Sequence, residues 1–358
     1  RRLNYAVTTS GIINVFEREK YVMNVEIEHQ RYGVDLIKID NEETKIVFTN
    51  YGARIVSWKY HDNNIVLGNV VEADEFYFDN PFRFGATVGR YGGRISNATF
   101  NLEGETYKLE ANDGQHHIHG GNHGLDSKLF DYEVIDDLGH VKIIFKTTLQ
   151  ETDDHYPGNM EIKVTHTYDA DHCWTIQYEA TSTKTTLFNP MNHVYFNLNR
   201  DNNVIDNHRV SSSKLNMYPL NEEHMISSDS TLDLQRIFNK DDIYFKDIFE
   251  SSHDQIAQQV AQFNGLDHPF KVGEQQLSID NDEFQLDVKT DMPYVVLYTF
   301  NQPKNWKSDA NIYKAHSGLT IEAQYLPNDI NLYGDQAYSI LKANEMFYSQ
   351  TSYQIHEK

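Results

Sequence analysis

Two segments place a histidine and a glutamate where they could line a cleft. If residues 189–198 form a strand, His193 lies on a polar face and the opposite face is apolar. Residues 316–325 likewise put Glu322 on a polar strand face, where a buried carboxylate is costly unless it is hydrogen-bonded or used. Histidine and glutamate are both suited to proton transfer. The alternative is that both segments are ordinary half-exposed strands.

A glycine-rich segment, residues 89–95, could bring the backbone close to a ligand. Its sequence, Gly-Arg-Tyr-Gly-Gly-Arg-Ile, combines tightly turning glycines with Arg90 and Arg94, whose guanidinium groups donate in a fixed geometry. The pattern matches neither a dinucleotide-binding loop nor a P-loop. The alternative is a plain turn with surface arginines.

Histidines cluster in residues 116–121, His-His-Ile-His-Gly-Gly. If this segment is extended, His117 and His119 point the same way and could hold a metal ion. The carboxylate expected a few residues later is absent, which favours hydrogen-bonding histidines beside a tight glycine turn. Another candidate is Asp267 in the loop-like residues 265–270, although an aspartate there could also be a turn residue.

Antiparallel strands are the elements that must position these side chains. Alternating runs that flank short turns predict hairpins at residues 100–109, 134–145, 160–180 and 277–288. Many short strands without alternating helices predict an all-β protein, a sandwich or a barrel with few short helices. One segment, residues 241–263, carries apolar side chains at helical spacing and is predicted to be a helix.

The composition narrows the classes of function. A net charge of −22 disfavours nucleic acid and anionic membranes as partners. The single cysteine, Cys173, excludes an intrachain disulfide framework. No apolar stretch is long enough to span a bilayer, and residues 11–16 are too short for a signal peptide. We expect a soluble, cytoplasmic protein with an N-terminal extension of unknown role, residues 1–22, and a single domain, residues 23–358.

The order of the candidate segments resembles the aldose 1-epimerase (galactose mutarotase) family. The motifs are, in chain order, Gly-Arg-x-x-x-Arg-Ile, His-Gly-Gly, Asn-His-x-Tyr-Phe-Asn-Leu, Gly-Leu-Asp-His-x-Phe and His-Ser-Gly-x-x-x-Glu-x-Gln. The resemblance runs from about Val25 to about Leu332. It implies a large antiparallel β-sandwich of the galactose mutarotase type, a sugar site in a cleft on one sheet, and neither a metal nor an organic cofactor.

The resemblance also implies roles for five residues. His193 matches the family's general acid and Glu322 its general base, whereas Arg94, His119 and Asp267 match residues that hold the sugar. The implied reaction interconverts the α and β anomers of a free aldohexose, galactose or glucose. One group accepts the proton of the anomeric hydroxyl while the other protonates the ring oxygen. We expect His193 to be charged and Glu322 ionised at the start of the reaction, because their proximity across a sugar favours both charged forms.

Sugar preference and some alternatives stay open. Residues 91–93 read Tyr-Gly-Gly where many relatives have Val-Ala-Asn, Val296 stands where a larger or polar residue is common, and residues 221–263 diverge from the family pattern. A non-catalytic carbohydrate-binding protein on the same fold, or an epimerase of a phosphorylated or modified hexose, would share much of this pattern. The expected partner is a small-molecule sugar, and the chain is expected to be a monomer or a homodimer.

Overall fold

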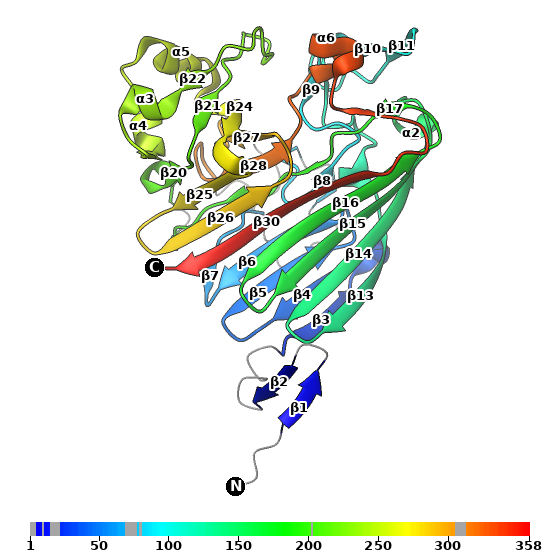
Figure 1. Ribbon diagram of the computed structural model, residues 1–358, viewed down its shortest axis with the longest axis vertical. Helices are drawn as coiled ribbons and strands as arrows, with labels where there is room; N and C mark the ends of the chain where they lie inside the picture. The colour runs from blue at the N-terminus through cyan, green and yellow to red at the C-terminus, as the bar shows by residue number, and fades with distance from the viewer. Residues whose placement is uncertain are drawn as a thin grey trace.

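Antiparallel strands make up most of the protein (Figure 1). The computed structural model describes residues 22–68, 77–78, 81–201, 203–304 and 313–358, and the backbone of residues 5–8 and 11–14. The predicted extension, residues 1–22, therefore lies largely outside the described residues. Within it, β1 (Tyr5–Thr8) and β2 (Gly11–Asn14) form a two-stranded hairpin.

The largest sheet has nine strands in the order β13-β14-β15-β16-β30-β26-β25-β20-β23. These strands are β13 (Asp131–Asp137), β14 (His140–Leu149), β15 (Met160–Asp169), β16 (Cys173–Ser182), β20 (Arg209–Ser211), β23 (Asp242–Tyr244), β25 (Gln276–Asp280), β26 (Phe284–Thr290) and β30 (Phe347–Glu357). The four predicted hairpins are confirmed. Three are β13–β14, β15–β16 and β25–β26, and the fourth pairs β10 (Thr99–Leu102) with β11 (Glu105–Lys108).

A five-stranded sheet packs against the largest one. Its strands are β3 (Asn24–His29), β4 (Asp35–Asp40), β5 (Thr44–Thr49), β6 (Arg54–Tyr60) and β7 (Asn63–Asn64). The rings of Trp58 and Trp174 meet edge to face at 6.0 Å between the two sheets. The indole Nε1 of Trp58 donates to the hydroxyl of Tyr168 at 3.0 Å, so a polar contact inside this apolar interface is satisfied. The sandwich expected from the sequence is confirmed.

A six-stranded sheet carries much of the candidate site. Its strands are, in spatial order, β19 (Tyr195–Phe196), β28 (Leu319–Gln324), β27 (Tyr294–Tyr298), β24 (Asp267–Val272), β21 (Leu215–Met217) and β22 (Leu232–Asp233). The single strand predicted for residues 189–198 is wrong. Here β18 (Met191–Asn192) pairs with β8 (Thr87–Val88), and β19 then pairs with β28. The chain changes pairing partner at His193.

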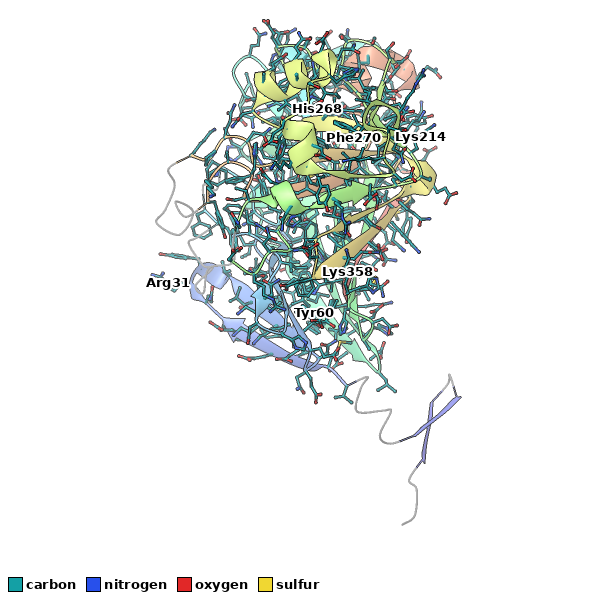
Figure 2. All side chains as sticks on the ribbon, turned by 90° about the vertical axis from the view of Figure 1, so that its left-hand side faces the viewer. Arg31, Tyr60, Lys214, His268, Phe270 and Lys358 are labelled. Carbon is teal, nitrogen blue, oxygen red and sulfur yellow. The ribbon has the colours of Figure 1, made fainter. Side chains whose placement is uncertain are left out.

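The helix predicted for residues 241–263 is also wrong in extent. The segment opens with β23, continues as α4 (Phe245–Phe249), and reaches α5 (Asp254–Phe263) after a break. The other α-helices of the described residues are α2 (Glu151–Asp154), α3 (Leu234–Phe238) and α6 (Asp329–Tyr333). Figure 2 shows helices gathered at one end of the molecule, around His268 and Phe270 of β24. Over the part of the chain described, no helix is long and apolar enough to cross a membrane.

Candidate active site

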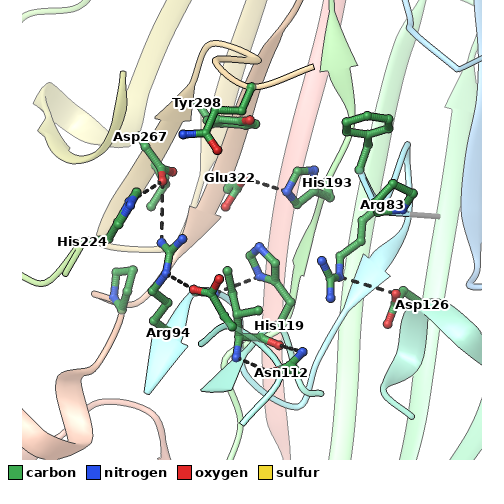
Figure 3. Close-up of a pocket in the computed structure, with 18 of the residues that line it drawn as sticks. Arg83, Arg94, Asn112, His119, Asp126, His193, His224, Asp267, Tyr298 and Glu322 are labelled. Carbon is green, nitrogen blue, oxygen red and sulfur yellow. Dashed lines mark hydrogen bonds and ion pairs between the residues drawn. The ribbon is translucent and has the colours of Figure 1, made fainter. Parts of the chain in front are cut away.

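All five candidate residues line one cleft of about 620 Å³ (Figure 3). Arg94 begins β9 (Arg94–Ile95), and His119 directly follows β12 (His117–Ile118), which pairs with β9. His193 lies between β18 and β19, Asp267 begins β24, and Glu322 lies within β28. Residues that are far apart in the chain therefore meet because their strands converge on this cleft.

His193 and Glu322 form the centre of the cleft. Nε2 of His193 lies 3.4 Å from Oε1 of Glu322, and the two side chains are 7% and 4% exposed. The Glu322 carboxylate also accepts a hydrogen bond from Thr320 Oγ1 at 3.0 Å and one from Gln324 Nε2 at 3.1 Å. The polar face predicted for this strand is thus buried, and its own side chains satisfy the carboxylate.

Burial shifts the pKa values of His193 and Glu322 in the directions that favour the neutral form of each side chain. Desolvation raises the pKa of Glu322, and the charge of Asp267 adds to the shift. Desolvation lowers the pKa of His193, and the positive charge of Arg83 lowers it further. Burial thus opposes the charged forms that proximity across a bound sugar is expected to favour, and that expectation stays a prediction for the complex with sugar. In the protein without sugar, burial therefore favours a neutral imidazole on His193 and a protonated carboxyl on Glu322.

Asp267 is held by two donors at one end of the cleft. Its Oδ2 atom lies 3.3 Å from Nδ1 of His224 and 3.6 Å from Nη1 of Arg94. Arg94 is itself oriented by a 2.6 Å hydrogen bond from its Nε to Asp113. Burial alone would raise the pKa of Asp267, but the hydrogen bond from His224 and the charge of Arg94 outweigh it and lower that pKa. Asp267 is therefore an ionised acceptor.

His119 presents a neutral imidazole to the cleft. Its Nδ1 accepts the backbone N–H of Gly93 at 3.1 Å, so its proton lies on Nε2. Burial lowers the pKa of His119 well below its usual value. The ring meets that of His193 edge to face at 5.2 Å. His119 can therefore donate one hydrogen bond from a fixed position close to the acid–base pair.

The expectation that His117 and His119 point the same way is wrong. His119 has a φ of 53°, which turns its side chain away from the direction that an extended strand would give. His117 instead bonds through Nδ1 to the carbonyl of Glu110 and through Nε2 to the hydroxyl of Tyr156, both at 2.7 Å. His117 is thus a buried structural residue. In the described ranges, no three His, Cys, Asp or Glu side chains gather as a metal site.

Arg90 is buried and does not line the cleft. Its Nε and Nη2 atoms donate to the two carboxylate oxygens of Asp154 at 2.8 and 3.0 Å, and both side chains are fully buried. A third nitrogen, Nη1, donates to the carbonyl of Pro157 and to Thr186. The reading of Arg90 as a surface arginine is wrong, because this arginine anchors the glycine-rich turn.

The sequence did not point to several residues that line the cleft. Arg83 lies with its Nε 3.5 Å from Oδ2 of Asp126, on the side away from Asp267 (Figure 3). His224 comes from the divergent stretch 221–263, and Tyr298 from β27. Arg83 stands between two phenylalanines, and His224 lies in a turn. Neither has a local sequence pattern that marks a ligand site, since the positions of both depend on tertiary packing.

The fold and the cleft together define a galactose mutarotase-like protein, with a buried imidazole and carboxylate on a sheet of a large antiparallel sandwich. The chain belongs to the aldose 1-epimerase family, whose sequence profile matches residues 35–354. The enzymes of this family are isomerases, and this chain is one of them.

Individual relatives agree with this assignment. Aldose 1-epimerase of Haemophilus influenzae is 30% identical, with 89% of this chain and 95% of the relative covered. Maltose epimerase of Levilactobacillus brevis is 25% identical, with 98% of each chain covered. The crystal structure of galactose 1-epimerase from Lactobacillus acidophilus matches with a TM-score of 0.81 at 25% identity, covering 94% of this chain and 99% of the other.

Proposed function

We propose that the protein interconverts the α and β anomers of a free aldohexose, galactose or glucose, with His193 as general acid and Glu322 as general base. The observation that supports this best is the buried pair itself, with Nε2 of His193 3.4 Å from Oε1 of Glu322 at the centre of a polar cleft. Ring opening needs one group that accepts a proton and one that donates it, each within reach of its own oxygen.

One proton shared by His193 and Glu322 is enough for both ring opening and ring closure. The anomeric hydroxyl donates a hydrogen bond to Glu322, and the ring oxygen accepts one from His193, so a bound sugar favours the charged form of each residue. The proton then moves from Glu322 to His193. As the ring opens, His193 protonates the ring oxygen and Glu322 takes the hydroxyl proton. Rotation about the C1–C2 bond and the reverse transfers close the ring on the other face.

Three further residues hold the sugar in this proposal. The ionised Asp267 accepts hydrogen bonds from hydroxyl groups, whereas Arg94 and the Nε2–H of His119 donate them. Each is fixed by its own protein partner, so the sugar meets a site that needs little reordering. Their contacts also retain the open-chain aldehyde until it closes.

A sugar without a phosphate group suits the charges of the cleft better than a phosphorylated one. Arg83 and Arg94 lie against the carboxylates of Asp126 and Asp113, and Arg90 is buried away from the cleft. Relatives bear the names galactose mutarotase and maltose epimerase, and both sugars have a free anomeric carbon. The proposed acid–base pair transfers protons at the hydroxyl on that carbon and at the ring oxygen.

Polarimetry on freshly dissolved α-D-galactose and α-D-glucose, with purified protein and excess chelator, tests the proposal. We expect faster decay of the optical rotation to the same end point as without protein. The variant His193→Asn should lose nearly all of this acceleration while keeping the wild-type circular dichroism spectrum. A protein that binds either sugar but does not accelerate the decay would contradict the enzymatic role and favour a carbohydrate-binding protein.

A further inference from the structure

A chain of hydrogen bonds connects Asp267 to α5, within the divergent stretch 221–263. The backbone N–H of Asp267 donates to Nδ1 of His268 at 3.0 Å, and Nε2 of His268 lies 2.8 Å from Oε1 of Gln259 in α5. Gln259 in turn accepts the N–H of Leu220 at 2.8 Å and donates to its carbonyl at 3.0 Å. Three of these four hydrogen bonds are buried and the one from Asp267 is partly buried, so they tie α5 and the turn after Leu220 to the start of β24.

The turn that follows Leu220 aims His224 at the cleft. The side chain of Asn221 accepts the N–H groups of Glu223 and Met225 at 2.9 and 3.0 Å. His224 lies between them with a φ of 62°, and its ring packs on Phe263 at 4.7 Å. The turn and the phenylalanine therefore fix the direction of the imidazole, which is 31% exposed and lines the cleft.

This imidazole controls which oxygen of Asp267 is available to a ligand. Nδ1 of His224 and Nη1 of Arg94 both approach Oδ2 of Asp267. No donor from the described part of the chain bonds to Oδ1. An ionised carboxylate accepts only, so Nδ1 of His224 must carry a proton and hold the carboxylate in one orientation.

The strand register places Asp267 relative to Glu322. Glu322 faces Val296, and Val296 faces Pro269, so Asp267 lies two strands from Glu322 and two residues further along. Two strand spacings and two residues along the strand put the two backbones about 12 Å apart, and both side chains lie on the same face of the sheet and line the cleft. With the anomeric hydroxyl at Glu322, the C2 hydroxyl is its nearest neighbour on the sugar and the first candidate for a hydrogen bond to Oδ1 of Asp267.

We propose that His224 is a positioning residue that orients Asp267 toward the C2 hydroxyl of the sugar, and that the enzyme thereby selects aldoses that carry this hydroxyl. This inference rests on the proposed epimerase function. It gives the divergent stretch 221–263 a role in substrate recognition, because the turn, α5 and β24 act as one hydrogen-bonded unit.

The test compares two His224 variants on a sugar and its 2-deoxy analogue. His224→Gly removes the imidazole and suits the left-handed backbone, whereas His224→Asn keeps a donor near the position of Nδ1 and also tolerates a positive φ. The matched control is His253→Ala, since His253 is an exposed residue before α5 that uses only its backbone groups. The substrates are glucose and galactose with their 2-deoxy analogues.

We expect His224→Gly to lower kcat/KM roughly tenfold on the sugar that carries the C2 hydroxyl, the effect of one lost charge-assisted hydrogen bond. The same variant should change kcat/KM on the 2-deoxy analogue less than about twofold, and His224→Asn should restore most of the activity. His253→Ala should match the wild type on both. If His224→Gly lowers kcat/KM equally on a sugar and on its 2-deoxy analogue, the inference is overturned.

A binding measurement separates this inference from the epimerase proposal. The cyclic sugar 1,5-anhydroglucitol has no anomeric hydroxyl and cannot be epimerised, so its affinity by calorimetry does not depend on turnover. His224→Gly should weaken its binding roughly tenfold but leave the binding of its 2-deoxy analogue unchanged. Equal affinities of wild type and variant for 1,5-anhydroglucitol would overturn the role of His224 even if the wild type proves to be an active epimerase.

Discussion

Tyr195 and Thr320 face each other across the antiparallel ladder of β19 and β28. Continued two residues further, this register puts His193 directly opposite Glu322, and their side-chain atoms are indeed 3.4 Å apart. His193 itself lies just past this ladder, where its N–H donates to the carbonyl of Ala86 and its carbonyl accepts the N–H of Gly85. Glu322 is held within β28 by its pairing with β27. Backbone hydrogen bonds on both sides therefore fix the proposed acid and base, as proton transfer to and from the oxygens of the sugar requires.

Replacing Glu322 by glutamine should remove activity without weakening the fold. Glutamine keeps the shape of the side chain but cannot accept a proton, so kcat should fall by roughly 10²–10⁴-fold. The native state binds the Glu322 proton more tightly than the unfolded chain does, because the pKa is raised by burial. Ionisation of Glu322 therefore lowers the free energy of unfolding of the wild type as pH rises above the usual glutamate pKa.

Calorimetry of Glu322→Gln across pH checks the stability half of this prediction. The Tm of the variant, relative to that of the wild type, should increase from acidic to alkaline pH, since glutamine carries no ionisation cost. A Tm difference that does not change with pH would mean that the carboxylate ionises as easily in the native protein as in the unfolded chain. Wild-type turnover by this variant would refute the base assignment.

The dependence of kcat/KM on pH should be bell-shaped and unusually broad. Only the form of the pair with one proton is competent. Two protons occupy the pair below the lowered pKa of His193, and none remains above the raised pKa of Glu322. The acid limb should therefore lie below the usual histidine pKa of about 6.5, and the alkaline limb far above the usual glutamate pKa of about 4.3. Initial rates across a pH series measure both limbs, and an acid limb at the ordinary histidine pKa would contradict the effect of burial.

Local patterns in the sequence were enough to predict the strand pairs. The register of β15 and β16 follows from two alternating runs around one short turn, so residues close in sequence determine it. The order of the motifs brought His193, Glu322 and Asp267 together as one set, and the structure places all of them on one cleft.

Features that depend on tertiary packing could not be predicted in this way. The positive φ of His119 separates it from His117, and alternation of polar residues carries no sign of a left-handed backbone. The raised pKa of Glu322 depends on burial by distant strands, and the position of His224 depends on α5. In each case, contacts between segments far apart in the chain decide the outcome.

The buried pair of Arg90 and Asp154 should be essential for stability. Asp154→Ala leaves an uncompensated guanidinium with no exposed surface, and we expect a loss of about 3–5 kcal/mol in the free energy of unfolding. Glu179→Ala is the matched control, because it breaks the partly exposed pair with Lys163 and should cost at most about 1 kcal/mol. Urea denaturation measures both. Similar losses in the two variants would show that burial does not distinguish these ion pairs.

The glycine at position 93 should be needed both for the fold and for His119. Its φ is 77°, and an added Cβ would lie only 2.7 Å from Cβ of Pro327, so Gly93→Ala should cost more than about 1 kcal/mol of stability. The same change displaces the N–H that bonds to Nδ1 of His119, and kcat/KM should fall with it. Gly104→Ala separates the two causes, since Gly104 has a similar φ of 83° with nothing within 4 Å of its Cβ position. Gly104→Ala should lose stability through backbone strain alone and keep the wild-type kcat/KM. If both substitutions change kcat/KM equally, the contact between Gly93 and His119 does not orient the sugar site.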